Sequence, residues 1–386
     1  MDFWEFRRRE FERRDARLQN AKPMKLKKIQ EKKVQEKKDK LHIVYVMTWT
    51  GLCGGSKIIL QHCNELVKRG HKASIVCHFP KPDWFLLDEK VVFIQVPLED
   101  VLCESIPRCD VIVATYWKEI YECVEQNIAP VVYFEQGDSH LFEPDGMDAR
   151  TMQHIRKQIS MAPFIYTVST FAKEKLRENF SVEAEVIPNA IDKNIFFPGK
   201  EEKINDGKIV ITAIGSENIH FKCIANIVVA VSLLKKLDKN IEFIWISPDT
   251  PGKLVTIPVS VNPSQKEIGD CLRRSDIFVC ASVYESFCLP VLEAMTCGAA
   301  VITTDNGGIR DFVEDNVNAL IIKKNNIAHM IEKLELLIDD AQLRKSLSSA
   351  AIKTAEEFDW KHTTDKLISY YQAIASNLCE EVHTSL

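Results

Sequence analysis

Residues 276–303, DIFVCASVYESFCLPVLEAMTCGAAVIT, decide how the chain is expected to fold. The apolar run 276–280 predicts a buried strand, and the run that follows Gly298 predicts the next strand. Between them, Pro290 is typical of the first turn of a helix, and Gly298 of the position just past a helix end. The stretch therefore predicts a strand, a loop, a short helix over 289–297 and a second strand, which is the repeating unit of a parallel α/β sheet.

The same alternation of apolar β-rich runs and helical periods extends along the chain on both sides. Strands are predicted at 41–47, 72–77, 91–96, 109–114, 130–134, 164–168, 208–214, 240–246, 255–259, 276–280, 299–303 and 318–322. Helices are predicted at 55–69, 117–126, 148–160, 170–179, 221–237, 264–273, 289–297, 325–337, 340–356 and 361–377. Proline, glycine and charged residues over 188–207 predict a linker. We therefore expect two doubly wound Rossmann-like domains with a cleft between them and ligands beyond the carboxyl ends of the strands.

The composition narrows the class of protein. The chain has 386 residues, enough for two domains, and no apolar run long enough for a transmembrane helix or a signal core. Its 12 cysteines are scattered, without the short spacings of a zinc site. This scatter predicts no bound metal, and free thiols in a reducing compartment are expected, which indicates a cytoplasmic protein.

Charge is distributed unevenly. Residues 1–40 have a net charge of +7, which leaves −12 for the rest of the chain. An acidic body argues against nucleic-acid binding. The basic arm is predicted to be a helical extension, which could be solvated, contact a membrane surface peripherally or bind a partner helix.

Two carboxylates distinguish the 276–303 stretch. Glu285 falls in the predicted loop and Glu293 in the first or second turn of the helix, so both are expected at the mouth of the sheet. The backbone N–H groups of Phe287, Cys288 and Leu289 begin the helix and suit a phosphate. A carboxylate accepts hydrogen bonds from the hydroxyls of a ribose or hexose. The combination predicts a nucleotide-sugar site, although each glutamate alone could be an ordinary surface or helix-start charge.

The segment 276–322 resembles the donor-site region of the family 4 retaining glycosyltransferases, which have the GT-B fold. Their signature is two glutamates separated by seven residues, as Glu285 and Glu293 are. The resemblance implies that Glu285 lies near the transferred sugar and that Glu293 holds the ribose. It also implies that the backbone at 287–289 meets the sugar and the diphosphate.

Other stretches resemble the same family and extend the likeness over about residues 41–376. They are GLCGGSKIILQHCNELVKRGHKASIV (51–76), VSTFAKEKLRE (168–178), VIPNAIDKNIFFP (186–198) and FDW (358–360). The implied domains are the basic extension 1–40, an N-terminal acceptor domain 41–188, a C-terminal donor domain 189–360 and a C-terminal helix, 361–386, that crosses back to the N-terminal domain.

The chain departs from the family pattern at several positions. A basic residue usually follows the glycine after the first strand of the donor domain, but here Ser216 follows Gly215. Lys222 fits the second basic position, and Cys223 follows it where glycine is common. Ala190 and Arg310 also replace usual residues, glycine and an acidic residue respectively. The missing charge could weaken binding of the diphosphate, to which a charge-assisted contact contributes about 1.5–3 kcal/mol.

Candidates for the acceptor side lie in the first domain. The stretch YFEQGDSHLFEP (133–144) predicts a polar loop after a strand, with Asp138 and His140 as candidate catalytic groups, and Glu135 and Gln136 as candidate contacts. The resemblance implies that the GLCGG loop, with Gly54 and Gly55, lies near the donor phosphates or the acceptor, where glycines let the backbone approach a ligand closely. This loop could also be a plain strand-to-helix turn, and it lacks the GxGxxG spacing of a dinucleotide site.

The resemblance implies retaining, metal-independent transfer of a sugar from a nucleoside-diphosphate sugar to a hydroxyl of a glycan, glycolipid or protein, in cell-surface polysaccharide or glycoconjugate synthesis. No cofactor beyond that co-substrate is implied. Lys222 and the helix-start N–H groups would stabilise the leaving diphosphate, which would itself take the acceptor's proton. Two alternatives stay open: a non-catalytic glycosyltransferase-like partner subunit with a weakened donor site, and another GT-B enzyme such as an epimerase or inverting transferase.

Overall fold

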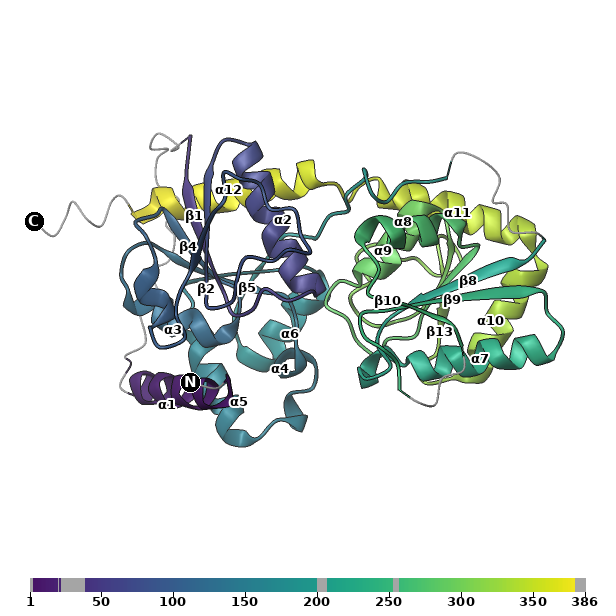
Figure 1. Ribbon diagram of the computed structural model, residues 1–386, viewed down its shortest axis with the longest axis horizontal. Coiled ribbons are helices and arrows are strands. Elements are labelled where there is room, and N and C mark those ends of the chain that lie inside the picture. Colours follow the sequence, from purple (N-terminus) through teal and green to yellow (C-terminus); the bar gives the residue numbers. More distant parts are fainter. Residues whose placement is uncertain (1–2, 20, 22–38, 200–206, 253–256, 379–386) are drawn as a thin grey trace, which may run out of the picture. The chain divides into compact units, whose positions relative to one another are not determined.

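The computed structural model describes residues 3–19, 21, 39–199, 207–252 and 257–378 (Figure 1). The chain divides into two compact units. The first comprises Met1–Val168, Ala172–Ile187 and Lys361–Leu386, and the second comprises Ser169–Phe171 and Pro188–Trp360. Each unit is a parallel sheet flanked by helices, as the alternating sequence pattern predicts.

The first unit contains a seven-stranded parallel sheet in the order β3-β2-β1-β4-β5-β6-β7. Its strands are β1 (His42–Met47), β2 (Lys72–Cys77), β3 (Val92–Gln95), β4 (Val111–Ala114), β5 (Val131–Glu135), β6 (Phe164–Thr167) and β7 (Glu185–Val186). Its α-helices are α1 (Phe3–Gln19), α2 (Gly54–Lys68), α3 (Ile120–Glu125), α4 (Ser139–Phe142), α5 (Ala149–Ser160), α6 (Thr170–Phe180) and α12 (Trp360–Leu378). The central strands are buried almost throughout, because helices cover both faces of the sheet.

The second unit contains a six-stranded parallel sheet in the order β10-β9-β8-β11-β12-β13. Its strands are β8 (Ile209–Ile214), β9 (Ile241–Ser247), β10 (Val259–Val261), β11 (Ile277–Cys280), β12 (Ala300–Thr304) and β13 (Leu320–Ile322). Its α-helices are α7 (Ile224–Lys236), α8 (Gln265–Arg274), α9 (Leu289–Cys297), α10 (Ile327–Asp339) and α11 (Ala341–Ala355). Apolar side chains from the strands and from α7 and α10 form one core.

The C-terminal helix α12 belongs to the first unit for most of its length. The Tyr371 hydroxyl lies 2.9 Å from that of Tyr45 on β1 and 3.1 Å from that of Tyr166 on β6. All three tyrosines are fully buried. The helix is therefore tied to the first sheet by a buried cluster of hydroxyls as well as by apolar contact.

Three local predictions are wrong. The strand predicted at 255–259 begins only at Val259, directly after Pro258, which cannot donate to a ladder; residues 255–256 lie outside the described part. The polar loop predicted at 133–144 contains the short helix α4. The helix predicted from 221 begins at Ile224, because Cys223 has a left-handed backbone, with φ 49°, that ends the preceding turn.

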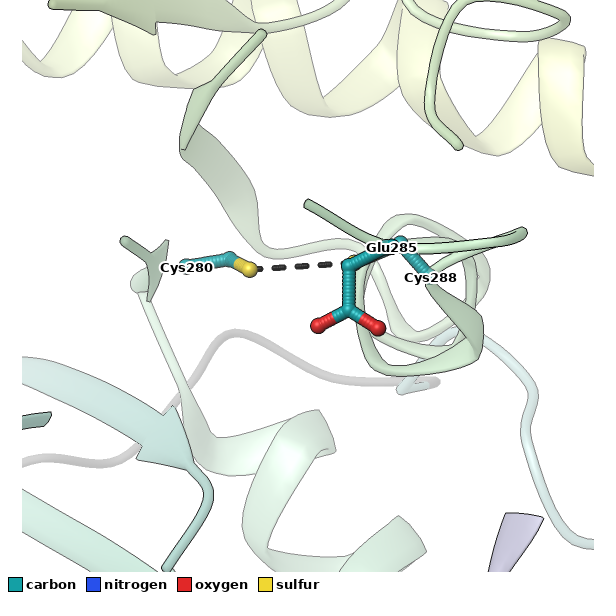
Figure 2. A group of neighbouring side chains, drawn as sticks. All are labelled: Cys280, Glu285 and Cys288. Carbon is teal, nitrogen blue, oxygen red and sulfur yellow. Dashed lines mark hydrogen bonds between the residues drawn. The ribbon is translucent and has the colours of Figure 1, made fainter. Parts of the chain in front are cut away.

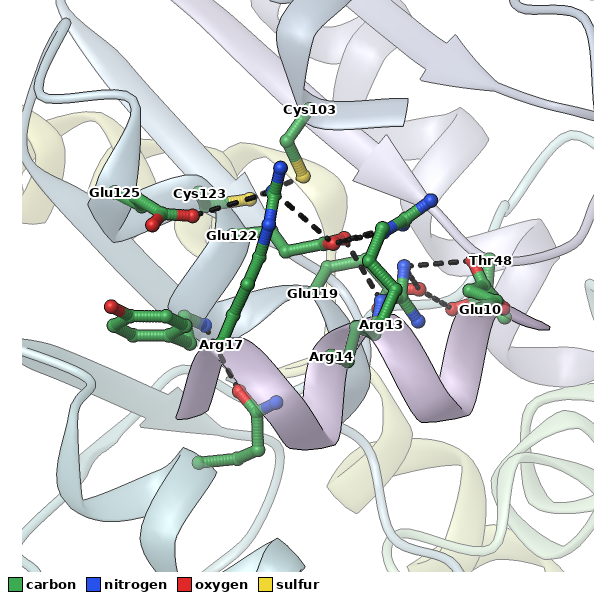
Figure 3. A network of polar contacts seen from close by, with 12 residues as sticks. Glu10, Arg13, Arg14, Arg17, Thr48, Cys103, Glu119, Glu122, Cys123 and Glu125 are labelled. Atoms are coloured by element: carbon green, nitrogen blue, oxygen red, sulfur yellow. Dashed lines mark hydrogen bonds and ion pairs between the residues drawn. The ribbon is translucent and has the colours of Figure 1, made fainter. Parts of the chain in front are cut away.

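The N-terminal helix α1 packs onto the first unit through arginines (Figure 3). Arg14 is 2% exposed, and its Nε donates to the buried carboxylate of Glu122 on α3, at 2.9 Å. Arg13 reaches the other oxygen of Glu122, and Arg17 pairs with Glu125. Burial raises the pKa of Glu122, but the two arginines outweigh burial, and the net pKa is lowered. The predicted basic extension therefore forms a helix over residues 3–19. Ion pairs between its arginines and the glutamates of α3 hold this helix to the rest of the first unit.

Glu119 in the same cluster behaves differently. Burial raises its pKa to about 7, only partly offset by Arg14. The Thr48 hydroxyl donates to it at 2.9 Å. The folded chain therefore retains a proton on Glu119 over a pH range in which the unfolded chain has released it.

We predict that Glu119→Gln removes part of the pH dependence of stability. The folded pKa is raised above the unfolded value, so the wild-type free energy of unfolding should fall as pH rises from about 4.5 to 7 through this one group. The neutral amide cannot lose a proton, so the variant should gain stability relative to wild type over that range. Urea unfolding from pH 4.5 to 8 measures the difference, and a constant difference across the range would contradict this assignment.

Candidate functional site

The second sheet reverses its strand order between β8 and β11, the position where open parallel sheets bind ligands. Loops leaving the carboxyl ends of these two strands meet there. They are residues 215–223 after β8 and residues 281–288 after β11. The predicted donor-site residues of the second unit lie in these loops or in α9, which follows the second loop.

Lys222 and Glu285 join the two loops. The Nζ of Lys222 lies 2.6 Å from Oε1 of Glu285, with the side chains 20% and 13% exposed. Burial alone lowers the pKa of Lys222, but the Glu285 carboxylate outweighs burial and raises it above its usual value. Lys222 is therefore a fixed positive charge at the sheet edge.

Neighbouring contacts hold this pair in place. The Phe221 ring stacks on Tyr284 with centroids 4.4 Å apart. The N–H of Val283 donates to the Phe221 carbonyl at 2.7 Å. Cys223, directly before α7, has a left-handed backbone, a conformation that glycine adopts readily. The turn carrying Lys222 is thus bonded to the loop carrying Glu285 through backbone and ring as well as charge.

The start of α9 offers backbone donors beside Glu285. Among the described residues, no hydrogen bond satisfies the N–H groups of Phe287, Cys288 and Leu289. Pro290 stands in the first turn, and Gly298 ends the helix with φ 81°, where glycine is favoured. The positive end of the helix dipole and these open donors suit an anionic group.

The two signature glutamates differ in exposure. Glu285 is part-buried in the loop, whereas Glu293 is 7% exposed within α9. We expected both at the mouth of the sheet from the sequence. The structure places Glu293 on the second turn of the helix whose first turn carries the open donors.

Ser216, where the resembling family has a basic residue, is buried and bonded to other groups. Its hydroxyl donates to Asp249 Oδ2 at 2.7 Å and accepts from the N–H of Asn218 at 3.0 Å. The same Asp249 oxygen accepts from the Asn218 side chain at 3.2 Å. The position at which the resembling family has a basic residue is therefore bonded to a carboxylate, that of Asp249. Lys222, beside Glu285, is the lysine in this loop.

Sequence reasoning missed the segment that supports the Glu285 loop. Residues 305–308, DNGG, follow β12. Glu285 N–H donates to the Asn306 carbonyl at 2.9 Å, and a β-carbon on Gly308 would lie 2.7 Å from both the Glu285 carbonyl and the Phe287 nitrogen. The paired glycines directly after a predicted strand are the signal that could have revealed this close approach of backbones.

Asp138 and His140, the candidate catalytic groups of the first unit, are held by other side chains. His140 is 1% exposed, and its Nε2 lies 2.8 Å from Glu135. Burial lowers the pKa of His140, but Glu135 outweighs burial and the net pKa is raised. Asp138 accepts from the Tyr116 hydroxyl at 2.7 Å and caps α4. The structure therefore shows His140 as a buried partner of Glu135, and Asp138 as the more accessible of the two candidates.

Gly54 and Gly55 begin α2, directly after β1 and its loop. A β-carbon on Gly55 would lie 3.3 Å from the side-chain nitrogen of Gln136, so this backbone approaches the end of β5 closely. Both the glycine turn and Gln136 lie at the carboxyl edge of the first sheet, near its own reversal of strand order between β1 and β4. A contact within the first unit therefore favours a small residue at position 55.

We predict that Gly308→Ala disturbs the site through the backbone of the Glu285 loop. The added methyl would meet backbone atoms that cannot move aside singly, and overpacking of this kind costs about 1–3 kcal/mol. Gly199→Ala is the matched control, since nothing lies within 4 Å of its added methyl. Thermal unfolding compares the two variants, and equal unfolding temperatures would contradict the contact.

Comparison with known proteins finds similarity to glycosyltransferases. Residues 255–354 match the family model "Glycosyl transferases group 1". An uncharacterized glycosyltransferase of Methanocaldococcus jannaschii is 28% identical over 223 residues, which cover 55% of this chain and 60% of that protein. The chain thus spans less than two thirds of the length of this curated relative.

Solved structures are similar over a larger share of the chain. Sucrose-phosphate synthase from Thermosynechococcus elongatus aligns with a TM-score of 0.74 at 15% identity, covering 86% of this chain and 98% of that one. Anabaena HepE in complex with UDP and glucose aligns with a TM-score of 0.72 at 15% identity, covering 86% and 99%. The chain therefore has the GT-B fold, and the matched residues 255–354 include the Glu285 loop and α9.

Proposed function

We propose that the chain is a retaining glycosyltransferase that moves a sugar from a nucleoside-diphosphate sugar to a hydroxyl acceptor. The observation that carries this proposal is the Lys222–Glu285 pair beside the open N–H groups at the start of α9. The Lys222 ammonium and the N–H groups suit the diphosphate of a nucleotide sugar. The neighbouring carboxylate suits the hydroxyls of its sugar or ribose. The group 1 match over 255–354 and the glycosyltransferase relatives support the same reaction.

In the proposed reaction, the bond between the anomeric carbon and the diphosphate oxygen breaks as the acceptor oxygen bonds to that carbon on the same face. The acceptor's proton passes to the leaving phosphate oxygen. Lys222 and the N–H groups of residues 287–289 stabilise the negative charge that develops there. Glu285 orients the sugar, and Glu293 holds the ribose hydroxyls. Because this chain supplies positive charge at the diphosphate, we propose that the transfer requires neither a metal ion nor another cofactor.

The acceptor is proposed only as a class: a glycan, glycolipid or protein, in synthesis of a cell-surface polysaccharide or glycoconjugate. Among the described helices, none is long and apolar enough to cross a membrane. Contact with an anionic membrane surface, at a cytoplasmic location, is proposed for residues 1–40, in which each lysine beyond α1 would contribute about 1 kcal/mol near such a surface.

A non-catalytic partner subunit is the second candidate, and Ser216 is the observation that favours it. Its hydroxyl is bonded to Asp249, so the loop after β8 lacks one cation that the resembling family uses on the diphosphate. This candidate differs from the first in one measurable property, because a subunit with a failed donor site would not bind nucleotide tightly.

We predict that one of UDP, GDP, dTDP and ADP binds in calorimetric titration, and that Lys222→Met weakens its binding by about 10- to 100-fold, the loss of one charge-assisted contact. Because that contact is to phosphate, the variant should bind the matching nucleoside as wild type does. Lys239→Met is the control, since Lys239 pairs with Asp339 in an exposed ion pair of the same unit. Failure of all four nucleotides to bind wild type would favour the partner subunit.

Glu293→Ala tests the second half of the donor site. Loss of a carboxylate that accepts from ribose hydroxyls should weaken the nucleotide, with a smaller effect on the corresponding 2′,3′-dideoxynucleotide, which lacks those hydroxyls. Equal effects on both ligands would contradict the ribose role. For a donor that turns over, the anomeric configuration of the product, read by NMR, separates retention from inversion; formation of an epimerised sugar without acceptor would instead show an epimerase.

A further inference from the structure

Two cysteines lie beside Glu285, and the proposed transfer uses neither thiol. Cys280 is the last residue of β11, and Cys288 directly precedes α9; both are buried. Their sulfurs are 3.7 Å apart. One ligand atom of each cysteine and of Glu285 lies within 4.8 Å of the others (Figure 2).

The spacing of the sulfurs fits a shared metal ion. Two thiolates on one tetrahedral zinc ion, each about 2.3 Å from it, lie about 3.8 Å apart. A disulfide would require the sulfurs to approach to about 2.05 Å. A zinc ion could therefore enter between the two sulfurs with little movement of either cysteine.

Glu285 supplies the third ligand without losing its lysine. Its Oε1 accepts from Lys222, and a carboxylate has a second oxygen that can bind a cation. The charges in the occupied site sum to zero: the two thiolates and the carboxylate are negative, and the divalent ion and the Lys222 ammonium balance them. Binding a metal would release the two thiol protons, so the occupied cluster carries no net charge into this part-buried place.

Asn306 provides a second, independent observation. It is fully buried, and its amide nitrogen lies 3.7 Å from the Cys288 sulfur and 4.0 Å from the Cys280 sulfur. Its amide oxygen has no hydrogen-bond partner among the described residues. Half a turn of the amide exchanges the two atoms and directs this unpartnered oxygen at the cluster, as a fourth ligand.

The backbone at Cys288 is also unusual. It is left-handed, with φ 63°, a conformation that costs a residue with a β-carbon about 1–2 kcal/mol. Glycine would adopt it more readily, but only a side chain here can place a sulfur beside Cys280. Strain retained at a site where a side chain meets other potential ligands is consistent with a functional role for that side chain.

We propose that Cys280, Cys288 and Glu285, with Asn306 as fourth ligand, form a binding site for a thiophilic divalent cation such as Zn²⁺. As a consequence that rests on the proposed function, the bound ion competes with the nucleotide sugar, because it occupies the Glu285 carboxylate. The site would then act as an inhibitory metal sensor within the donor site, distinct from any requirement of the transfer itself.

The first test is Co²⁺ titration of the phosphine-reduced, chelator-treated full chain. Co²⁺ bound by thiolates in a tetrahedral site gives a thiolate-to-metal charge-transfer band in the near ultraviolet and visible d–d bands, which Zn²⁺ should abolish at one equivalent. Cys280→Ser and Cys288→Ser should each weaken the charge-transfer band and reduce affinity. Absence of thiolate bands in the wild-type protein would overturn the proposal without any variant.

The chain offers a matched control. Cys103 and Cys123 in the first unit have sulfurs 3.6 Å apart, but no third ligand group joins them among the described residues. Cys103→Ser should leave the cobalt spectrum unchanged; loss of the bands in this variant would place the ion there instead and overturn the site. Asn306→Asp, which keeps an oxygen at this position, should retain binding, whereas Asn306→Ala should weaken it.

The second test separates the metal site from the proposed function. Calorimetric titration with a nucleotide sugar that carries the nucleotide bound by wild type is repeated with one equivalent of Zn²⁺, and at least a 10-fold loss of affinity is expected. Unchanged affinity for the nucleotide sugar with the cobalt bands present would overturn the competition. Cobalt bands in a chain that binds no nucleotide would support the metal site and contradict the transferase. Nucleotide binding without cobalt bands would support the transferase and contradict the metal site.

Discussion

The ion pair between Lys222 and Glu285 is the interaction on which the candidate site depends. Lys222 stands in the loop beyond the carboxyl end of β8, and Glu285 in the loop beyond that of β11. The pair therefore lies where the strand order of the sheet reverses. An ion pair this close to the interior offsets part of the desolvation of both groups, whereas removing one partner would leave the other poorly solvated. Because the two groups already pair with each other, a ligand that binds either of them meets a charge that is partly neutralised.

Backbone packing determines where that pair can form. Glu285 is bonded through its N–H to Asn306, and Gly308 lets the DNGG segment approach the Glu285 loop closely. The β11 loop therefore has the β12 loop on one side and the Lys222 turn on the other. The open N–H groups at the start of α9 are held by the same packing, so the cationic and hydrogen-bonding parts of the site keep a fixed spacing before any ligand binds.

Much of this arrangement could be predicted from local signals. Pro290 and Gly298 set the ends of α9, and the alternation of strands and helices predicts both sheets. Contacts between loops could not be predicted, because they depend on pairs distant in sequence: Lys222 with Glu285, and Ser216 with Asp249. The approach of the Cys280 and Cys288 sulfurs could not be predicted either, because Cys288 itself has a left-handed backbone. His140 shows the same limit in the first unit, since only the fold shows that it is buried against Glu135.

Charge in the N-terminal arm is divided between two roles. Residues 1–19 carry six arginines but a net charge of only +1, and Arg13, Arg14 and Arg17 are used in contacts with the glutamates of α3. Residues 20–40 carry a net charge of +6, nearly all of the arm's excess. Helix α1 therefore serves mainly as a docked part of the first unit, and an attraction to an anionic surface would have to come from the lysine-rich residues that follow it.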